Sequence, residues 1–162
     1  MARGKSCCFT GHRVIPQESY YRVLFLLRQT VENKIKEGYT DFYAGGALGF
    51  DTLAALTVLR LKMMYKNVRL HLILPCISQA DKWSGEDRRM YEKIKDESDS
   101  VEYISFEYNP HCMNRRNRAL VDKADCCIAY CTQSSGGTVY TISYAMDNDV
   151  TVENIAHKVN SI

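Results

Sequence analysis

Short apolar segments alternate along this chain with longer segments whose apolar residues recur every three or four positions. The short segments are typical of strands and the longer ones of amphipathic helices, because side chains alternate between the two faces of a strand but return to one face of a helix every turn. We predict strands at 6–10, 42–44, 68–74, 101–106, 124–130 and 150–155, and helices at 17–37, 51–65, 84–97, 113–123 and 138–146. This alternation indicates an α/β fold with three layers: a doubly wound, mostly parallel sheet of about six strands with helices on both faces.

The length and composition of the chain indicate one domain that spans residues 1–162. Hydrophobic residues make up 46% and charged residues 25%, which are ordinary values for a globular protein. No apolar run approaches the roughly 18 residues of a membrane span, and the first residues lack the apolar core of a signal peptide. We therefore expect a cytoplasmic protein with no membrane partner. The net charge of +2 provides no strong footprint for nucleic acid, so we do not expect nucleic acid as a partner.

The seven cysteines include two adjacent pairs, Cys7-Cys8 and Cys126-Cys127, each within a predicted strand. Adjacent strand residues point to opposite faces, so neither pair resembles a disulfide or a metal-binding pair. There is no C-x-x-C motif, and His111, Cys112 and Cys131 match no zinc spacing. We expect buried, reduced cysteines that act as small hydrophobic residues, and no metal site.

A glycine-rich turn, G-G-A-L-G, lies between the second predicted strand and the second predicted helix. Gly45, Gly46 and Gly49 permit positive φ and a close approach of a ligand to the backbone, and the helix that begins near Asp51 favours negative charge at its first turn. The spacing is neither the dinucleotide fingerprint nor the P-loop. Two interpretations stay open: an anion site, or a tight turn whose glycines serve packing with Asp51 as an ordinary N-cap.

The loops that leave the predicted strands are chemically richer than those that enter them. The leaving loops contain TGHR, GGALGFD, PCISQADKW, EYNPHC and QSSGGT, whereas the entering loops are EGYT, YKN, SDS and DND. In an open parallel sheet, ligands bind outside the carboxyl ends of the strands. The asymmetry therefore predicts a ligand site at the carboxyl edge of the sheet.

The first leaving loop contains Thr10, Gly11, His12 and Arg13. Arg13 could form a bidentate pair with a phosphate. His12 could donate a hydrogen bond to a ligand oxygen or act in acid–base chemistry. A turn with solvated side chains is the alternative, but loop residues on a rigid scaffold carry function more often than other residues do.

The last leaving loop contains Ser135, Gly136, Gly137 and Thr138 and repeats the strand–glycine–helix arrangement. Two such loops on one edge could hold two phosphates, or a phosphate and a ribose. The alternative is a single structural N-cap.

The helix predicted at 113–123 opens with Arg115, Arg116, Asn117 and Arg118. Cations at a helix N-terminus are unfavourable to the helix dipole, and a bound anion would relieve that cost. Any one of these arginines could instead be a solvated surface residue, and the sequence does not decide which of the three contacts a ligand.

Two further loop residues and one strand histidine need assignment. Gln79 and Trp83 lie in a loop that is too long for a simple connection. Trp83 could stack on a base or could cover the end of the sheet. His71 alternates with apolar residues in a strand near the sheet edge, and we interpret it as a partly exposed strand residue rather than a catalytic group.

These segments together resemble the YpsA-like branch of the SLOG superfamily, which is related to the DNA-processing protein DprA and to the LOG nucleotide hydrolases. The resemblance covers nearly the whole chain and rests on CCFTGHR, AGGALGFDTLAA, PCISQADKW, RRNRALVDKAD and GGTVYTISYA in that order. It implies a Rossmann-like fold that binds a nucleotide or a nucleotide-derived ligand, such as an ADP-ribose-like molecule, at the glycine loops. It also implies homo-oligomers, often dimers, and no obligatory cofactor.

One departure from the hydrolytic LOG pattern P-G-G-x-G-T-x-x-E concerns its glutamate. When Gly137-Thr138 is placed on the final G-T, Thr141 stands where the glutamate belongs, and the proline is also missing. A hydroxyl does not replace a carboxylate in acid–base chemistry at neutral pH. We therefore lean against an enzyme and assign no catalytic residue.

Three hypotheses follow. The first is a binding domain for a nucleotide or nucleotide-derived small molecule that acts as a sensor, carrier or sequestering protein in bacterial stress, conflict with phage or cell-division control. The second is a hydrolase of an N-glycosidic or phosphoribosyl bond that uses Asp51 or His12. The third is a DprA-like binder of single-stranded DNA, against which the low net charge argues. The predicted ligand-binding residues are Thr10, Gly11, His12, Arg13, Gly45, Gly46, Gly49, Asp51, Gln79, Trp83, Arg116, Asn117, Ser135, Gly136, Gly137 and Thr138.

Overall fold

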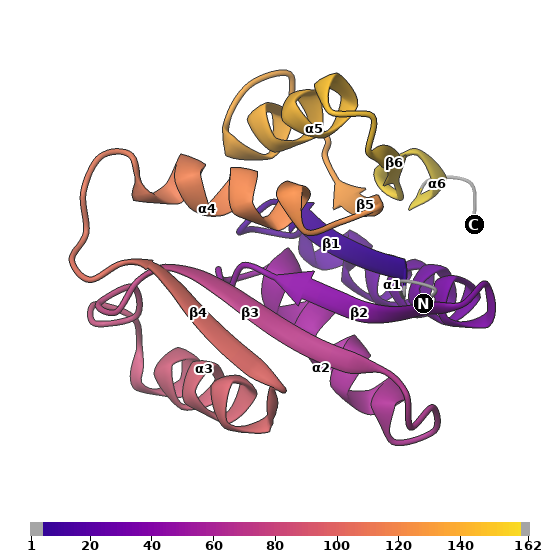
Figure 1. Cartoon of the computed structure of the whole chain (residues 1–162), viewed down its shortest axis with the longest axis horizontal. Helices are drawn as coiled ribbons and strands as arrows, with labels where there is room; N and C mark the ends of the chain where they lie inside the picture. Colours follow the sequence, from indigo (N-terminus) through magenta and orange to yellow (C-terminus); the bar gives the residue numbers. More distant parts are fainter. Residues whose placement is uncertain (1–4, 160–162) are drawn as a thin grey trace.

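The structure, a computed structural model, describes residues 5–159 and contains one six-stranded sheet in which all five strand pairs are parallel. The strand order is β4-β3-β2-β1-β5-β6, which places the first strand in the middle (Figure 1). The strands are β1 Lys5–Gly11, β2 Tyr39–Ala44, β3 Arg69–Cys76, β4 Ser100–Ser105, β5 Cys126–Tyr130 and β6 Thr151–Asn154. The order reverses direction at β1, which is the arrangement of a doubly wound, Rossmann-like sheet.

Helices cover both faces of this sheet, so the three-layer prediction is confirmed (Figure 1). One face carries α1, α2 and α3, and the other carries α4 and α5. The helices are α1 Tyr20–Lys36, which follows a short 3-10 helix at Gln17–Ser19, α2 Phe50–Lys62, α3 Gly85–Glu97, α4 Cys112–Asp122, α5 Gly137–Asp147 and α6 Ala156–Val159.

Each face of the sheet has its own core because successive strand residues point to opposite sides. In β1, Cys7 and Phe9 contribute to the core under α1 and α2, whereas Cys8 contributes to the core under α4 and α5. All three side chains are fully buried. A strand buried on both faces reads as a continuous apolar run, which explains the sequence of β1.

Several details differ from the sequence prediction. β3 does not end before Pro75 but continues to Cys76; beyond Leu72 its register partners lie in β4 alone, so one side of the strand is unpaired at the proline. The terminal helix α6 has only four residues, too few for a periodic signal, and was not predicted. The seven cysteines are free, although Cys7 is the register partner of Cys126 and Cys8 that of Cys127. Six of them are buried, as expected, whereas Cys131 is half-buried. No helix within residues 5–159 has the length and apolar character needed to cross a membrane.

Candidate functional site

A cavity of about 330 Å³ lies at the carboxyl edge of the sheet, where the sequence predicted a ligand site. The loop after β1 and the first turns of α2, α4 and α5 surround this cavity, because parallel strands deliver all of these segments to one edge. Its lining residues are Phe9, Thr10, Gly11, His12, Arg13, Ala47, Asp51, Met113, Asn114, Arg116, Asn117, Leu120, Gly137 and Thr138.

His12 joins the loop after β1 to the loop after β5. Its Nε2 atom accepts a hydrogen bond from the Thr132 N–H at 2.9 Å, and its Nδ1 lies 3.4 Å from the Thr138 hydroxyl. An Nε2 that accepts carries no proton, so the neutral ring has its proton on Nδ1. Burial lowers the pKa of His12, which favours this neutral form. His12 therefore positions the second loop, and its Nε2 lone pair is already occupied.

Arg116 brings a buried positive charge to the cavity. Its side chain is 5% exposed, its Nε donates to Asn117 Oδ1 at 2.9 Å, and its Nη1 donates to the Gly45 carbonyl. Burial lowers the pKa of Arg116, the Asp51 carboxylate opposes that shift, and the guanidinium of Arg13 adds to it. Within residues 5–159, Arg116 forms no salt bridge. A buried guanidinium without a closely paired carboxylate favours an anionic ligand.

Asp51 is buried in the first turn of α2 and holds the first glycine loop from inside. Its Oδ2 accepts a hydrogen bond from the Ala47 N–H at 3.2 Å. Burial raises the pKa of Asp51, while Arg116 and the Ala47 hydrogen bond act in the opposite direction. Gly49, not Asp51, is the N-cap residue, so the interpretation of Asp51 as an ordinary N-cap is wrong.

The helices that line the cavity lack side-chain caps at their N-termini. The N-cap residues Gly49 of α2, His111 of α4 and Gly136 of α5 accept no capping hydrogen bond through a side chain. By contrast, Ser84 caps α3 by accepting from the Asp87 N–H at 3.2 Å. These three helix starts bring their positive dipole ends to the cavity, although the Phe50 N–H of α2 already donates to the His12 carbonyl and the Cys112 N–H of α4 to the Asn109 carbonyl.

A second cavity of about 410 Å³ adjoins the first, and Arg13 and Met113 line both. Its other lining residues are Pro75, Cys76, Ser78, Gln79, Asp81, Lys82, Trp83 and Tyr108. The ring of Trp83 packs edge-on against Tyr91 at 5.2 Å. Gln79 accepts from the Tyr91 hydroxyl at 3.3 Å, and its Nε2 is a buried donor without a partner within residues 5–159. The second cavity is therefore more aromatic than the first.

Comparison with known families decides what kind of chain carries this site. The model of the YpsA family, described as the YspA SLOG family, matches residues 16–159. The chain belongs to this family. Among curated relatives, a UPF0398 protein from Bacillus licheniformis is 27% identical over 131 residues, which cover 76% of this chain and 72% of that protein. A UPF0398 protein from Halalkalibacterium halodurans is 31% identical over 94 residues, which cover 56% of this chain and 49% of that protein.

Two solved structures share the fold of this SLOG chain. DNA processing protein A (DprA) from Helicobacter pylori has a TM-score of 0.65 and 19% sequence identity, with 92% of this chain and 64% of that chain covered. DprA from Streptococcus pneumoniae has a TM-score of 0.66 and 15% identity, with 92% of this chain and 49% of that chain covered. This chain thus corresponds to about half to two thirds of the DprA chains.

The expectation that nucleic acid is an unlikely partner is wrong. The H. pylori DprA, which shares this fold, is described as binding single-stranded DNA. The physical reason for the error is that net charge sums over the whole surface, whereas a nucleic acid meets only one part of it. Here Arg13 and Arg116 share one cavity and Lys82 lines its neighbour, although the whole chain carries only +2.

The structure brings together most of the sixteen predicted site residues. Those that line the first cavity are Thr10, Gly11, His12, Arg13, Asp51, Arg116, Asn117, Gly137 and Thr138, and Gln79 and Trp83 line the second. Gly45, Gly46, Gly49, Ser135 and Gly136 line neither cavity. Of the three candidate arginines, Arg116 is the buried one that reaches the cavity, whereas Arg118 donates to the Tyr140 hydroxyl at 2.9 Å.

Sequence reasoning missed Met113 and Asn114 in the first cavity and Tyr108 in the second. All three lie in or just after the leaving loop EYNPHC. The rule that leaving loops carry the site identified this loop, but no local motif singled out these side chains. Within residues 5–159, no group of histidine, cysteine or acidic side chains is placed to hold a metal ion.

Proposed function

We propose that this protein binds a nucleotide-derived small molecule, with phosphate in the first cavity and the base in the second, and that it acts as a sensor, carrier or sequestering protein. The observation that carries the proposal is the buried Arg116, which forms no salt bridge within residues 5–159, at a cavity that is also lined by the first turns of three helices without side-chain caps. An anion there is favoured both by the buried guanidinium and by the positive ends of the helix dipoles.

The first cavity has the charge balance that a phosphate needs. Arg13 is exposed and can form a bidentate pair with phosphate oxygens. Arg116 is buried and lines the same cavity. The neutral His12 and the Thr138 hydroxyl add polar groups without negative charge. Asp51 is the one carboxylate among the lining residues, and it is placed to accept from a ribose hydroxyl.

The second cavity has the apolar character that a base needs. Trp83, Tyr108 and Met113 offer flat or polarisable surfaces for stacking, and the buried Gln79 amide lies among them. Because Arg13 and Met113 belong to both cavities, one molecule with a phosphate at one end and a base at the other spans them.

Binding without turnover is the form of this function that we propose. Thr141, which stands where LOG hydrolases have glutamate, is fully buried and donates to the Gly137 carbonyl at 2.8 Å within α5. His12 uses both ring nitrogens to hold the second loop. These contacts favour positioning roles over acid–base chemistry for both residues.

Thermal unfolding in the presence of nucleotides, ADP-ribose derivatives and cyclic signalling nucleotides tests the proposal. A ligand at 100 times its dissociation constant adds about 2.7 kcal/mol to the free energy of unfolding. We expect a shift for at least one compound, its recovery intact by chromatography, and loss of the shift in Arg13→Ala. Arg13 is exposed, so this variant should unfold at the wild-type temperature without ligand. No shift with any compound would contradict the proposal, and a consumed compound would replace it with an enzyme.

Single-stranded DNA is a second candidate ligand, because exposed aromatic residues lie beside the second cavity. Tyr108 is 67% exposed and lines the second cavity. Phe106 is 78% exposed, and its backbone carbonyl accepts a hydrogen bond from the Ile77 N–H. Stacking on such rings contributes about 1–3 kcal/mol per base. Fluorescence anisotropy of a labelled oligothymidine at several salt concentrations tests this candidate. DNA binding predicts a salt-dependent affinity that falls in Tyr108→Ala, and an affinity unchanged in that variant would rule out the stacking role.

A further inference from the structure

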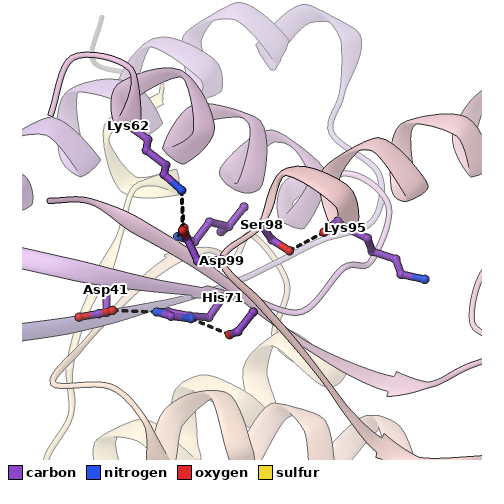
Figure 2. A network of polar contacts seen from close by, with 8 residues as sticks. Asp41, Lys62, His71, Lys95, Ser98 and Asp99 are labelled. Carbon is purple, nitrogen blue, oxygen red and sulfur yellow. Dashed lines mark hydrogen bonds and ion pairs between the residues drawn. The ribbon is translucent and has the colours of Figure 1, made fainter. Parts of the chain in front are cut away.

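A hydrogen-bonded line of three side chains crosses β2, β3 and β4, away from the two cavities (Figure 2). Asp41 Oδ1 lies 2.7 Å from His71 Nε2, and His71 Nδ1 lies 2.7 Å from Ser100 Oγ. His71 and Ser100 are register partners on neighbouring strands. The sequence suggested only a partly exposed strand residue at His71, because no local motif joins residues that lie about thirty positions apart.

The direction of these hydrogen bonds follows from the acceptor at one end. A carboxylate only accepts, so His71 Nε2 carries the proton that is donated to Asp41. The neutral ring then has a lone pair on Nδ1, which accepts from the Ser100 hydroxyl. This is the order of roles in an activated serine: acid residue, oriented imidazole, nucleophile.

Neighbouring contacts hold Asp41, His71 and the residue before Ser100 in place. Asp41 Oδ2 accepts from the Thr40 hydroxyl at 2.9 Å, and the ring of Tyr43 stacks on the imidazole at 4.7 Å. The residue before Ser100 is clamped as well. Asp99 Oδ2 accepts from the Leu70 N–H at 2.8 Å, and Lys62 lies 2.6 Å from the same carboxylate (Figure 2). Sites held by strands and by such supporting contacts are more precise than sites on loops.

We propose that Asp41, His71 and Ser100 form a nucleophilic site that accepts acyl or phosphonyl groups from small activated esters. Ser100 is exposed, so an ester reaches it directly from solvent, and an open face favours small substrates. The Ser100 oxygen attacks the ester carbonyl carbon while its proton passes to His71 Nδ1. Collapse of the tetrahedral intermediate expels the alcohol, which takes that proton. Water then hydrolyses the acyl-serine with His71 again as the base, so ester and water give acid and alcohol.

Labelling with a fluorophosphonate tests this site on the intact protein. In that reaction the Ser100 oxygen bonds to phosphorus and fluoride leaves with the proton taken by His71. Mass spectrometry of the peptides should place the label on Ser100, and Ser100→Ala should remove it. His71→Gln should slow labelling by about 100-fold, because a positioned general base contributes about 10²–10⁴-fold. Asp41→Asn, which preserves shape, should slow it by at least about 10-fold.

Two control variants separate the reactivity of Ser100 from simple exposure of a serine. Ser98 is a nearby serine whose hydroxyl donates to the Lys95 carbonyl at 2.7 Å, so Ser98→Ala should label at the wild-type rate. Ser84 is an exposed serine whose hydroxyl accepts from the Asp87 N–H at 3.2 Å, so Ser84→Ala should also label at the wild-type rate. Thermal unfolding confirms that each variant is folded. Labelling of Ser100 no faster than of Ser98, or an unchanged rate in both His71→Gln and Asp41→Asn, would overturn the proposal and leave the line as a structural link between strands.

Discussion

The two glycine loops at the carboxyl edge have similar sequences but meet different surroundings. The first loop, 45–49, is filled by the protein itself. A Cβ atom on Gly45 would lie 2.8 Å from Arg116 Nη1 and 2.9 Å from Asp51 Oδ2, and one on Gly49 would overlap the main chain of Arg13. Gly46 and Gly49 also have φ of 74° and 79°, which side chains rarely adopt. Its glycines are required by packing.

The second loop, 134–138, leaves space instead. Outside its own helix, a Cβ atom on Gly137 would come no nearer than 3.8 Å, at Asn117 Nδ2. One on Gly136 would meet only Gln133 at 4.0 Å, although the φ of 111° at Gly136 still favours glycine there. Gly137 lines the first cavity together with Asn117. A strand–glycine–helix pattern therefore does not indicate whether protein atoms or a ligand occupy the space left by the missing side chain. Only the surrounding elements decide that.

The largest expected effect is the loss of stability in Gly49→Ala. We expect the free energy of unfolding to fall by about 3 kcal/mol, because positive φ and a clash with the Arg13 main chain combine. Urea unfolding measures this loss. Gly38→Ala is the matched control, because Gly38 has φ of 101° but nothing within 4 Å of a Cβ, and it should cost only about 1 kcal/mol. Equal losses in the free energy of unfolding at the two positions would contradict the role given to the Arg13 main chain at Gly49.

The next effect concerns Arg116, which donates to the Gly45 carbonyl in the first loop and lines the same cavity as Gly137 of the second loop. Arg116→Met should lower the free energy of unfolding by about 2 kcal/mol, since it leaves buried polar partners unsatisfied. The same variant should abolish any ligand-induced thermal shift. Retention of that shift would show that the anion does not bind at Arg116.

Gly137→Val should affect binding and not stability. The added side chain enters the cavity, so we expect at least about tenfold weaker ligand binding, or 1.4 kcal/mol. The temperature of unfolding without ligand should stay close to that of the wild type, because the position has room for a side chain. A large fall in that temperature would place Gly137 in the same class as Gly49.

The smallest effect is the pH dependence that His12 contributes. Burial lowers the pKa of His12 from its ordinary value of 6.5, so the unfolded chain takes up a proton more readily than the folded one. The contribution of His12 to the free energy of unfolding should therefore be fully present above pH 6.5 and should be lost as the pH falls below that value. Urea midpoints at pH 5.5 and 7.5 should differ less in His12→Asn than in the wild type. An unchanged difference would assign the pH dependence to other groups.

The fold could be predicted from sequence because its signals are local. The periodicity of β1 and α1 and the alternation of elements are visible within short windows, and the topology rule then places the site at one edge. The roles of individual residues could not be predicted in this way. The main chain of Arg13 leaves no room for a side chain at Gly49. Arg116 is positioned by its hydrogen bond to the Gly45 carbonyl, and His12 by its hydrogen bond from the Thr132 N–H. Each of these contacts joins segments that are distant in sequence.

The most direct test of the account is calorimetric titration of the wild type and Gly137→Val with ADP-ribose. We expect saturable binding of ADP-ribose to the wild type and at least about tenfold weaker binding to a Gly137→Val protein that unfolds at nearly the same temperature. Equal affinity for the two proteins would contradict it, because the ligand would then occupy a place other than the space beside the second glycine loop.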